Sequence, residues 1–218
     1  MSRTRAENEF PQASLAAAVV AADRLERIFQ TLAERALLET GATSVAIGLM
    51  RNGGLTCRAT AGLPITAVGD PISHETGLTG LAIGRQMSQW CSDTEFDTRV
   101  NYEVCRQLGL RSIIVVPVSL QDAVVGVFAI FSGDPDAFSL AHLNAVKKLS
   151  HWISEAVEHE IDNTAPAPAI VDRERSDQQP PTIFNSGHAQ KRGLRDYAAK
   201  IWRTMARVLS RGQNGHTG

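Results

Sequence analysis

The chain has 218 residues, of which 43% are hydrophobic, and its formal net charge is −1. This length and composition suit a single domain with appended segments and are too small for two full domains. A nearly neutral chain lacks the overall positive charge typical of nucleic-acid-binding proteins, so we expect no nucleic-acid partner.

Charge is unevenly distributed along the chain. Residues 190–218 contain seven Lys or Arg residues and one Asp, a net charge of +6, whereas residues 1–189 contain fifteen basic and 22 acidic residues, a net charge of −7. Such a basic end on an acidic body is typical of a segment with its own partner, although a solvated tail has the same asymmetry.

The cysteines and the apolar runs indicate the compartment. Cys57, Cys91 and Cys105 are odd in number and have no CxxC spacing, which argues against a disulfide framework and against a structural zinc site. The N-terminal apolar run is too short for a signal peptide, and no stretch approaches the roughly 20 apolar residues of a membrane span. We therefore expect a cytoplasmic protein.

The first half of the chain predicts a helix followed by a hairpin. Residues 13–40 have apolar positions at spacings of three and four, and Gly41 is a usual stop for such a helix. The short apolar run 42–50 is typical of a buried strand. A tight turn at 52–54 leads into a second strand at 55–61, which together give a hairpin signal.

The middle of the chain is less regular. Residues 62–76 are rich in Gly and Pro and predict a loop with one short edge strand. A short helix is expected at 78–84 and a brief strand at 89–91. A polar connection over 93–104 then runs into a helix that ends at Gly109.

The strongest strand signals follow. The apolar runs 112–118 and 124–131 are separated by a polar turn at 119–123, so we expect them to pair antiparallel as central strands. Ser139 is a suitable N-cap for a helix with one apolar stripe that continues to Glu160.

The chain therefore divides into five predicted regions. Residues 1–12 are expected to be disordered, and 13–161 form the domain. Residues 162–189 combine prolines with charges and have too few large apolar residues to offset the entropy of folding, which predicts a flexible linker. Residues 190–210 predict an isolated basic amphipathic helix, and 211–218 a disordered tail. We expect the amphipathic helix to dock on an anionic membrane surface, on an acidic protein, or on the acidic body of its own domain.

Residues 78–157 contain four consecutive motifs, followed by a closing helix: LTGLAIGRQM, DTEFDTRVN, GLRSIIVVPV and VVGVFAIFS. In their order and spacing these motifs resemble the GAF domain family. Upstream, Gly41–Gly62 resembles the opening hairpin of the same family. The resemblance implies an α+β fold, with a twisted antiparallel sheet, flanking N- and C-terminal helices on one face, and a pocket over the other.

A pocket in this fold is expected between the connection 90–104 and the strand that starts at Arg111. Eight candidate ligand-binding residues lie there: Trp90, Cys91, Asp93, Phe96, Arg99, Tyr102, Arg111 and Ser112. Each also has a simpler structural explanation. Asp side chains commonly cap turns, Arg99 and Arg111 are able to pair with nearby carboxylates, and Trp90 is able to fill the core.

The cofactor is not evident from the sequence. The scattered motif of GAF domains that bind cyclic nucleotides cannot be assembled at plausible spacing. The Cys-His pair of bilin-binding relatives is missing where the family places it, at Val100-Asn101. Haem would need a ligand such as His74, and a single loop histidine is usually a surface residue. We also predict no metal site.

These observations predict a non-catalytic sensory or signalling module that binds an unidentified small molecule. We expect a homodimer, because the stripe containing Ala18 and Ala22 would let two long helices approach closely. One alternative is a thiol-dependent enzyme similar to free methionine sulfoxide reductases, using Cys91 and Cys105. A nearby Asp93 would raise a thiol pKa, which disfavours that reading. Another alternative is a scaffold whose pocket is filled by its own side chains.

Overall fold

The computed structural model describes residues 12–51 and 53–164. The predicted 190–210 helix, the chain ends and most of the predicted linker lie outside the described residues. In chain order the elements are α1 (Gln12–Thr40), β1 (Ser44–Arg51), β2 (Gly54–Gly62), β3 (Pro71–Ile72), α2 (Gly77–Arg85), β4 (Gln89–Cys91), α3 (Tyr102–Gln107), β5 (Ser112–Leu120), β6 (Ala123–Ser132) and α4 (Leu140–Thr164).

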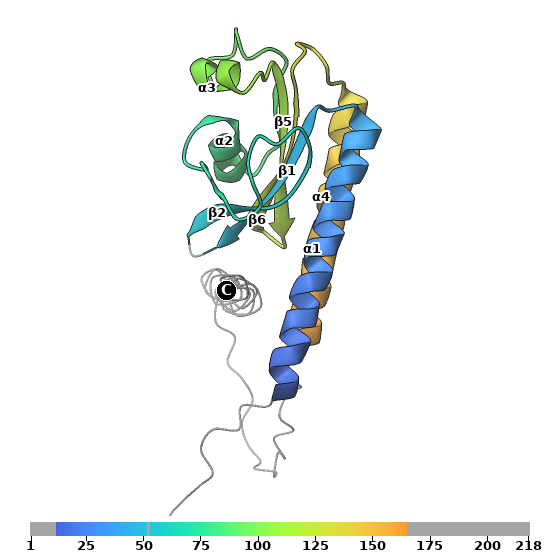
Figure 1. The fold of residues 1–218 in the computed structure, drawn as a ribbon. Helices are drawn as coiled ribbons and strands as arrows, with labels where there is room; N and C mark the ends of the chain where they lie inside the picture. Colours follow the sequence, from blue (N-terminus) through green and yellow to red (C-terminus); the bar gives the residue numbers. More distant parts are fainter. Residues whose placement is uncertain (1–11, 52, 165–218) are drawn as a thin grey trace, which may run out of the picture.

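The strands form one antiparallel sheet in the order β3-β2-β1-β6-β5-β4. The two predicted hairpins, β1–β2 and β5–β6, are joined at the centre of the sheet by the pairing of β1 with β6. In Figure 1, α1 and α4 lie side by side and antiparallel on one face of the sheet, while α2 and α3 lie on the other. The α+β fold expected from the family resemblance is therefore confirmed.

Successive residues of the central strands point to opposite faces and differ in size. In β1, the fully buried Val45, Ile47 and Leu49 belong to the core beneath α1 and α4, which we call the helix-side core. The alternate positions from 44 to 48 of the same strand hold the small residues Ser44, Ala46 and Gly48. The face that carries the long helices is therefore densely packed, whereas the small side chains of β1 on the opposite face fill little space.

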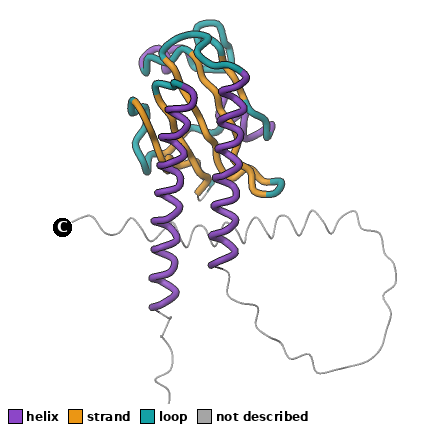
Figure 2. Tube along the Cα trace, turned by 90° about the vertical axis from the view of Figure 1, so that its right-hand side faces the viewer, coloured by secondary structure: helices purple, strands orange, loops and turns teal. Residues whose placement is uncertain are grey.

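The long helices are held by large apolar side chains. Phe29 of α1 and Ile153 of α4 are completely buried in the helix-side core, together with Phe128 of β6. Burial of one such side chain stabilises the fold by about 1.5–3 kcal/mol. Both helices continue past the end of the sheet, as Figure 2 shows from the side. None of the helices that the structure describes is long and apolar enough to cross a membrane.

The predicted elements agree with the observed ones to within a few residues. The Ser139 hydroxyl accepts the backbone N–H of His142 at 3.4 Å, as expected of an N-cap. α4 ends at Thr164, slightly beyond the predicted Glu160. Ala22, one of the residues on which the expected dimer contact rested, is already buried within a single chain. The homodimer stays a prediction.

Replacing Phe29 by alanine tests the helix-side core. The change leaves a cavity in a fully packed site, so we expect it to lower the free energy of unfolding by about 3–5 kcal/mol. Leu38 of the same helix is 84% exposed, and Leu38→Ala should change stability by less than about 0.5 kcal/mol. Urea unfolding of both variants checks this, and equal losses would contradict the described packing of α1.

Candidate functional site

A cavity of about 550 Å³ lies on the face of the sheet opposite α1 and α4. Its floor is formed by β1, β5 and β6, and its walls by the loop around β3, the start of α2, and α3. Residues from these elements that line it include Ala46, Ile113, Val115, Val127, Ala129 and Phe131 on the floor, and Ile65, Ile72, Leu78, Val104, Cys105 and Leu108 on the walls. Cavities of this size accommodate ordinary small-molecule ligands.

The floor is hollow because two alanines meet at its centre. Ala46 of β1 is the cross-strand partner of Ala129 of β6, and Val115 of β5 is the next residue in the same row. Cross-strand neighbours have their Cβ atoms only about 5 Å apart, so two methyl groups in one row leave space that larger side chains would fill. The cavity is thus a consequence of side-chain size on this face of the sheet.

The loop around β3 closes one side of the cavity by packing on a glycine. A Cβ atom at Gly48 would come within 2.9 Å of Ile72 Cδ1 and 3.2 Å of Leu55 Cγ. Glycine at this position therefore lets Ile72 lie directly against β1, where it contributes to the cavity wall.

The polar groups that line the cavity are neutral. They come from Thr66 and Ser73 near β3, from Thr76 and Thr79 at the start of α2, and from Asn101 before α3. The Thr76 side chain makes no capping hydrogen bond although it occupies the N-cap position of α2. Among the residues that the structure describes, none that lines the cavity carries a charged side chain.

The eight residues predicted to contact a ligand do not line this cavity. Trp90 packs against the helix-side core, on the other face of the sheet. Cys91 is buried within the cluster of apolar residues on the cavity side of the sheet, and Ser112 donates its hydroxyl proton to the Asp134 carbonyl at 2.9 Å. Phe96 is 83% exposed, and Tyr102 is also exposed. A direct ligand contact by any of them stays a prediction.

Arg111 is held by two carboxylates. Its guanidinium donates to both carboxylate oxygens of Asp93, at 2.9 and 2.7 Å, and to Glu95 at 3.1 Å. This fork geometry fixes the start of β5 to the connection after β4. The hydrogen bond from Arg111 lowers the pKa of the Asp93 carboxyl. The pairing of Arg111 with a nearby carboxylate, suggested by the sequence as the simpler explanation, is thus present in the structure.

Arg99 plays a similar part further along the connection. It donates to Asp97 at 2.6 and 2.9 Å, to the Trp90 carbonyl at 2.7 Å and to the Gln89 side chain at 3.3 Å. The hydrogen bond from Arg99 lowers the pKa of Asp97 to about 2. Arg99 therefore ties the 92–101 connection to the edge strand β4.

All three cysteines are buried. Burial raises the pKa of the Cys57 thiol to about 11, while burial and a hydrogen bond with Asp97 raise that of Cys91 to about 12. Burial also raises the pKa of Cys105, the only one of the three among the described cavity-lining residues. Thiols in this state are poor nucleophiles, because the reactive form is the thiolate.

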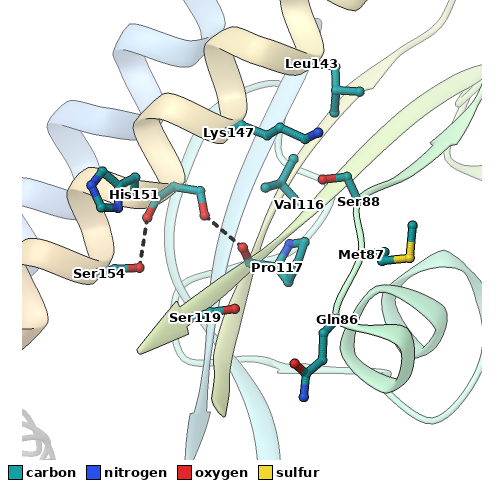
Figure 3. A pocket seen from close by; sticks show the side chains of 11 residues that line it. Gln86, Met87, Ser88, Val116, Pro117, Ser119, Leu143, Lys147, His151 and Ser154 are labelled. Carbon is teal, nitrogen blue, oxygen red and sulfur yellow. Dashed lines mark hydrogen bonds between the residues drawn. The ribbon is translucent and has the colours of Figure 1, made fainter. Parts of the chain in front are cut away.

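A second hollow, of about 460 Å³, lies between α4, residues 116–119 of β5 and the segment 86–88 that joins α2 to β4 (Figure 3). Lys147 and His151 of α4 lie along one side of it. The Ser150 hydroxyl donates to the Pro117 carbonyl at 3.0 Å, and the Ser154 hydroxyl to the Ser150 carbonyl at 3.3 Å. The Ser150 hydrogen bond therefore fastens α4 to β5, and the Ser154 hydrogen bond lies within α4. Residues 12–51 and 53–164 contain no group of three His, Cys, Asp or Glu residues that could hold a metal ion.

The cavity and the eight predicted residues share segments of the chain but differ in the kind of side chain. The connection before α3 and the strand β5 do supply lining residues, such as Val104 and Val115. Most of the predicted residues are charged or aromatic, whereas the cavity depends on small residues at alternate positions of β1 and β6. The alternation of small and large residues along 44–49 was a signal that could have indicated it.

Comparison with known proteins identifies the fold. A family model described as GAF domain matches residues 24–159. Solved structures with a similar fold include the GAF domain region of a Geobacter sulfurreducens protein (23% identity, TM-score 0.59, covering 64% of this chain and 97% of that one). Another is a type II free methionine-R-sulfoxide reductase from Thermoplasma acidophilum (19% identity, TM-score 0.56, covering 64% of this chain and 96% of that one).

A third is the GAF domain of an Acinetobacter phosphoenolpyruvate-protein phosphotransferase (20% identity, TM-score 0.53, covering 70% of this chain and 95% of that one). Identities at this level establish the fold alone. A comparison with curated proteins returned no similar sequence.

Asp97→Asn tests the ion pair that fastens the 92–101 connection. Because the folded-state pKa of Asp97 is below that of an ordinary carboxyl, the folded protein binds fewer protons here than the unfolded chain. Its stabilisation is complete above about pH 4 and is lost as the pH falls toward 2. At neutral pH the variant should be less stable by about 1 kcal/mol, and the difference from wild type should close on acidification.

Thermal unfolding across this pH range measures the difference. Glu103→Gln is the matched control, because Glu103 forms an exposed pair with Arg106 at 3.1 Å on α3. Exposed pairs of this kind contribute little, so the control should follow wild type at every pH. A constant offset between Asp97→Asn and wild type down to the lowest pH would contradict the proposed linkage.

Proposed function

This chain belongs to the GAF domain family, and we propose that it is a sensory module that binds a small molecule in the cavity above β1 and β6. The observation that carries the proposal is the cavity itself, which is lined mainly by apolar side chains with a few neutral polar groups. Binding is proposed to change the packing of α1 and α4, with output through a partner protein or through residues 190–210.

The arrangement of the sheet supports this coupling. Ala46 lies under the cavity, and its neighbours Val45 and Ile47 pack in the helix-side core. Ala129 is similarly flanked by Phe128 and Ile130. A ligand that moves β1 or β6 therefore changes the surface on which the long helices rest. The ligand can shift the equilibrium between two arrangements of α1 and α4 only by the difference in its binding free energy for the two.

Ala129→Leu tests whether the cavity holds a ligand. The leucine side chain extends from the floor into the open space, so it should block binding without disturbing the helix-side core. Native mass spectrometry of protein gently purified from its own cells should find a bound small molecule on wild type, and at least about tenfold less on Ala129→Leu, a loss of about 1.4 kcal/mol in binding.

Ala141→Leu, an equal change on the exposed surface of α4, is the control and should retain the ligand. Thermal unfolding should confirm that Ala129→Leu is folded. The sensory proposal would be contradicted by a wild-type protein that carries no molecule and is not stabilised by a small-molecule extract of the same cells. That outcome would favour the ligand-free scaffold.

A thiol-dependent reductase is a second candidate function. It is favoured by the position of Cys105 in the cavity wall and by the similar fold of a free methionine-R-sulfoxide reductase. The raised pKa values of the cysteines oppose it, because a thiol with a high pKa has little thiolate at neutral pH.

We expect wild-type protein with a dithiol reductant to show no turnover of free methionine sulfoxide beyond that of the Cys105→Ser variant. Cys57→Ser is the matched control, since Cys57 is a buried thiol that does not line the cavity. Turnover that is lost in Cys105→Ser and kept in Cys57→Ser would establish the reductase and overturn the non-catalytic assignment.

A further inference from the structure

The chemical character of the cavity limits what it can hold. The floor residues Ala46, Val115, Val127 and Ala129 are apolar, and each of them is at most 5% exposed. A ligand on this floor loses its water on that side and gains only apolar contacts. Apolar ligand surface is therefore favoured there, and a charged group is not.

The charged side chains that flank the cavity on the 92–101 connection, on α3 and at the start of β5 include three arginines that pair with carboxylates. Arg111 binds Asp93 and Glu95, Arg99 binds Asp97, and Arg106 of α3 pairs with Glu103. None of these seven residues lines the cavity. A carboxylate or phosphate bound inside would find no cation among the described lining residues, and an ammonium group would find no carboxylate. An ion buried without a partner is strongly disfavoured.

Among the described residues around the cavity, those at the start of α2 favour negative charge. Gly77, Leu78 and Thr79, in the first turn of α2, line the cavity, and the N-terminal end of a helix carries a partial positive charge. Together with the Thr76 hydroxyl, which makes no capping bond, this end suits an electron-rich neutral oxygen such as a carbonyl, ether or hydroxyl. The partial charge of a helix end is smaller than the full charge of a carboxylate.

We propose that the cavity selects an uncharged, mainly apolar small molecule that carries few neutral polar groups. This inference rests on the proposed sensory function and names the class of ligand for the same site. Threonine and serine hydroxyls and the Asn101 amide are able to donate to and accept from such groups without requiring charge.

A displacement experiment with matched probes tests this selectivity. The purified full-length chain is loaded with N-phenyl-1-naphthylamine, a neutral probe that fluoresces in apolar surroundings. It is then titrated at neutral pH with 1-octanol, octanoate or octylammonium, which share one chain and differ in head-group charge. We expect 1-octanol to displace half of the probe at a concentration at least about tenfold lower than either ion.

Two variants locate the binding and the origin of the selectivity. Ala129→Leu should reduce probe binding at least about tenfold, whereas Ala141→Leu should not. Val104 lies at the cavity wall and is 47% exposed, so a lysine is tolerated there. Val104→Lys should improve octanoate relative to 1-octanol by about fivefold. Val20→Lys adds the same charge on α1, at a position 63% exposed, and should leave the ratio unchanged.

The outcomes separate the two proposals. Displacement by octanoate or octylammonium as effective as that by 1-octanol would overturn the neutral-ligand inference and leave the sensory function intact. Probe binding that is unaffected by Ala129→Leu would place the probe outside the cavity and would also overturn the inference. Absence of probe binding by wild type from which any retained molecule has been removed would overturn it as well, while the retained-ligand measurement decides the sensory function independently.

Discussion

The alternation of side-chain size along β1 and β6 determines the rest of the structure. One face of these strands presents Val45, Ile47, Phe128 and Ile130, which hold α1 and α4, and the other face presents Ala46 and Ala129 at its centre. A shift of either strand by one residue would exchange the two faces, filling the cavity and leaving the helices without a core. The packing that stabilises the domain and the space that it offers to a ligand therefore have the same origin.

The ion pairs on the cavity side of the sheet complement this division. Arg111 and Arg99 are held by Asp93 and Asp97, and they fasten the connection between β4 and α3 to the neighbouring strands. The connection leads into α3, which supplies part of the cavity wall. These ion pairs thus hold α3 and its part of the cavity wall in place, and their charges neutralise one another. The described residues that line the cavity are neutral. Such an arrangement favours selection by shape and apolar surface over selection by charge.

Much of the fold could be predicted from local sequence patterns. The helix α1 is indicated by apolar residues at spacings of three and four in 13–40 and by the Gly41 stop. The hairpin β5–β6 is indicated by the two apolar runs at 112–118 and 124–131. Each of these patterns lies within one element or one hairpin, so it can be interpreted without knowledge of distant residues. The pairing of β1 with β6 joins segments about 80 residues apart, and the family resemblance implied only an antiparallel sheet without its strand order. The candidate site was harder to predict. Charged residues such as Arg111 are the usual candidates for ligand binding in a sequence, whereas this cavity exists because the side chains of Ala46 and Ala129 are small.

The central claim is that the face of small residues on β1 and β6 is the ligand site of this domain. A crystal structure of the protein with N-phenyl-1-naphthylamine tests it most directly. We expect electron density for the probe above Ala46 and Ala129, enclosed by the loop around β3 and by α3. Density in the hollow beside Lys147 and His151 instead, with the cavity above Ala129 empty or collapsed, would contradict it.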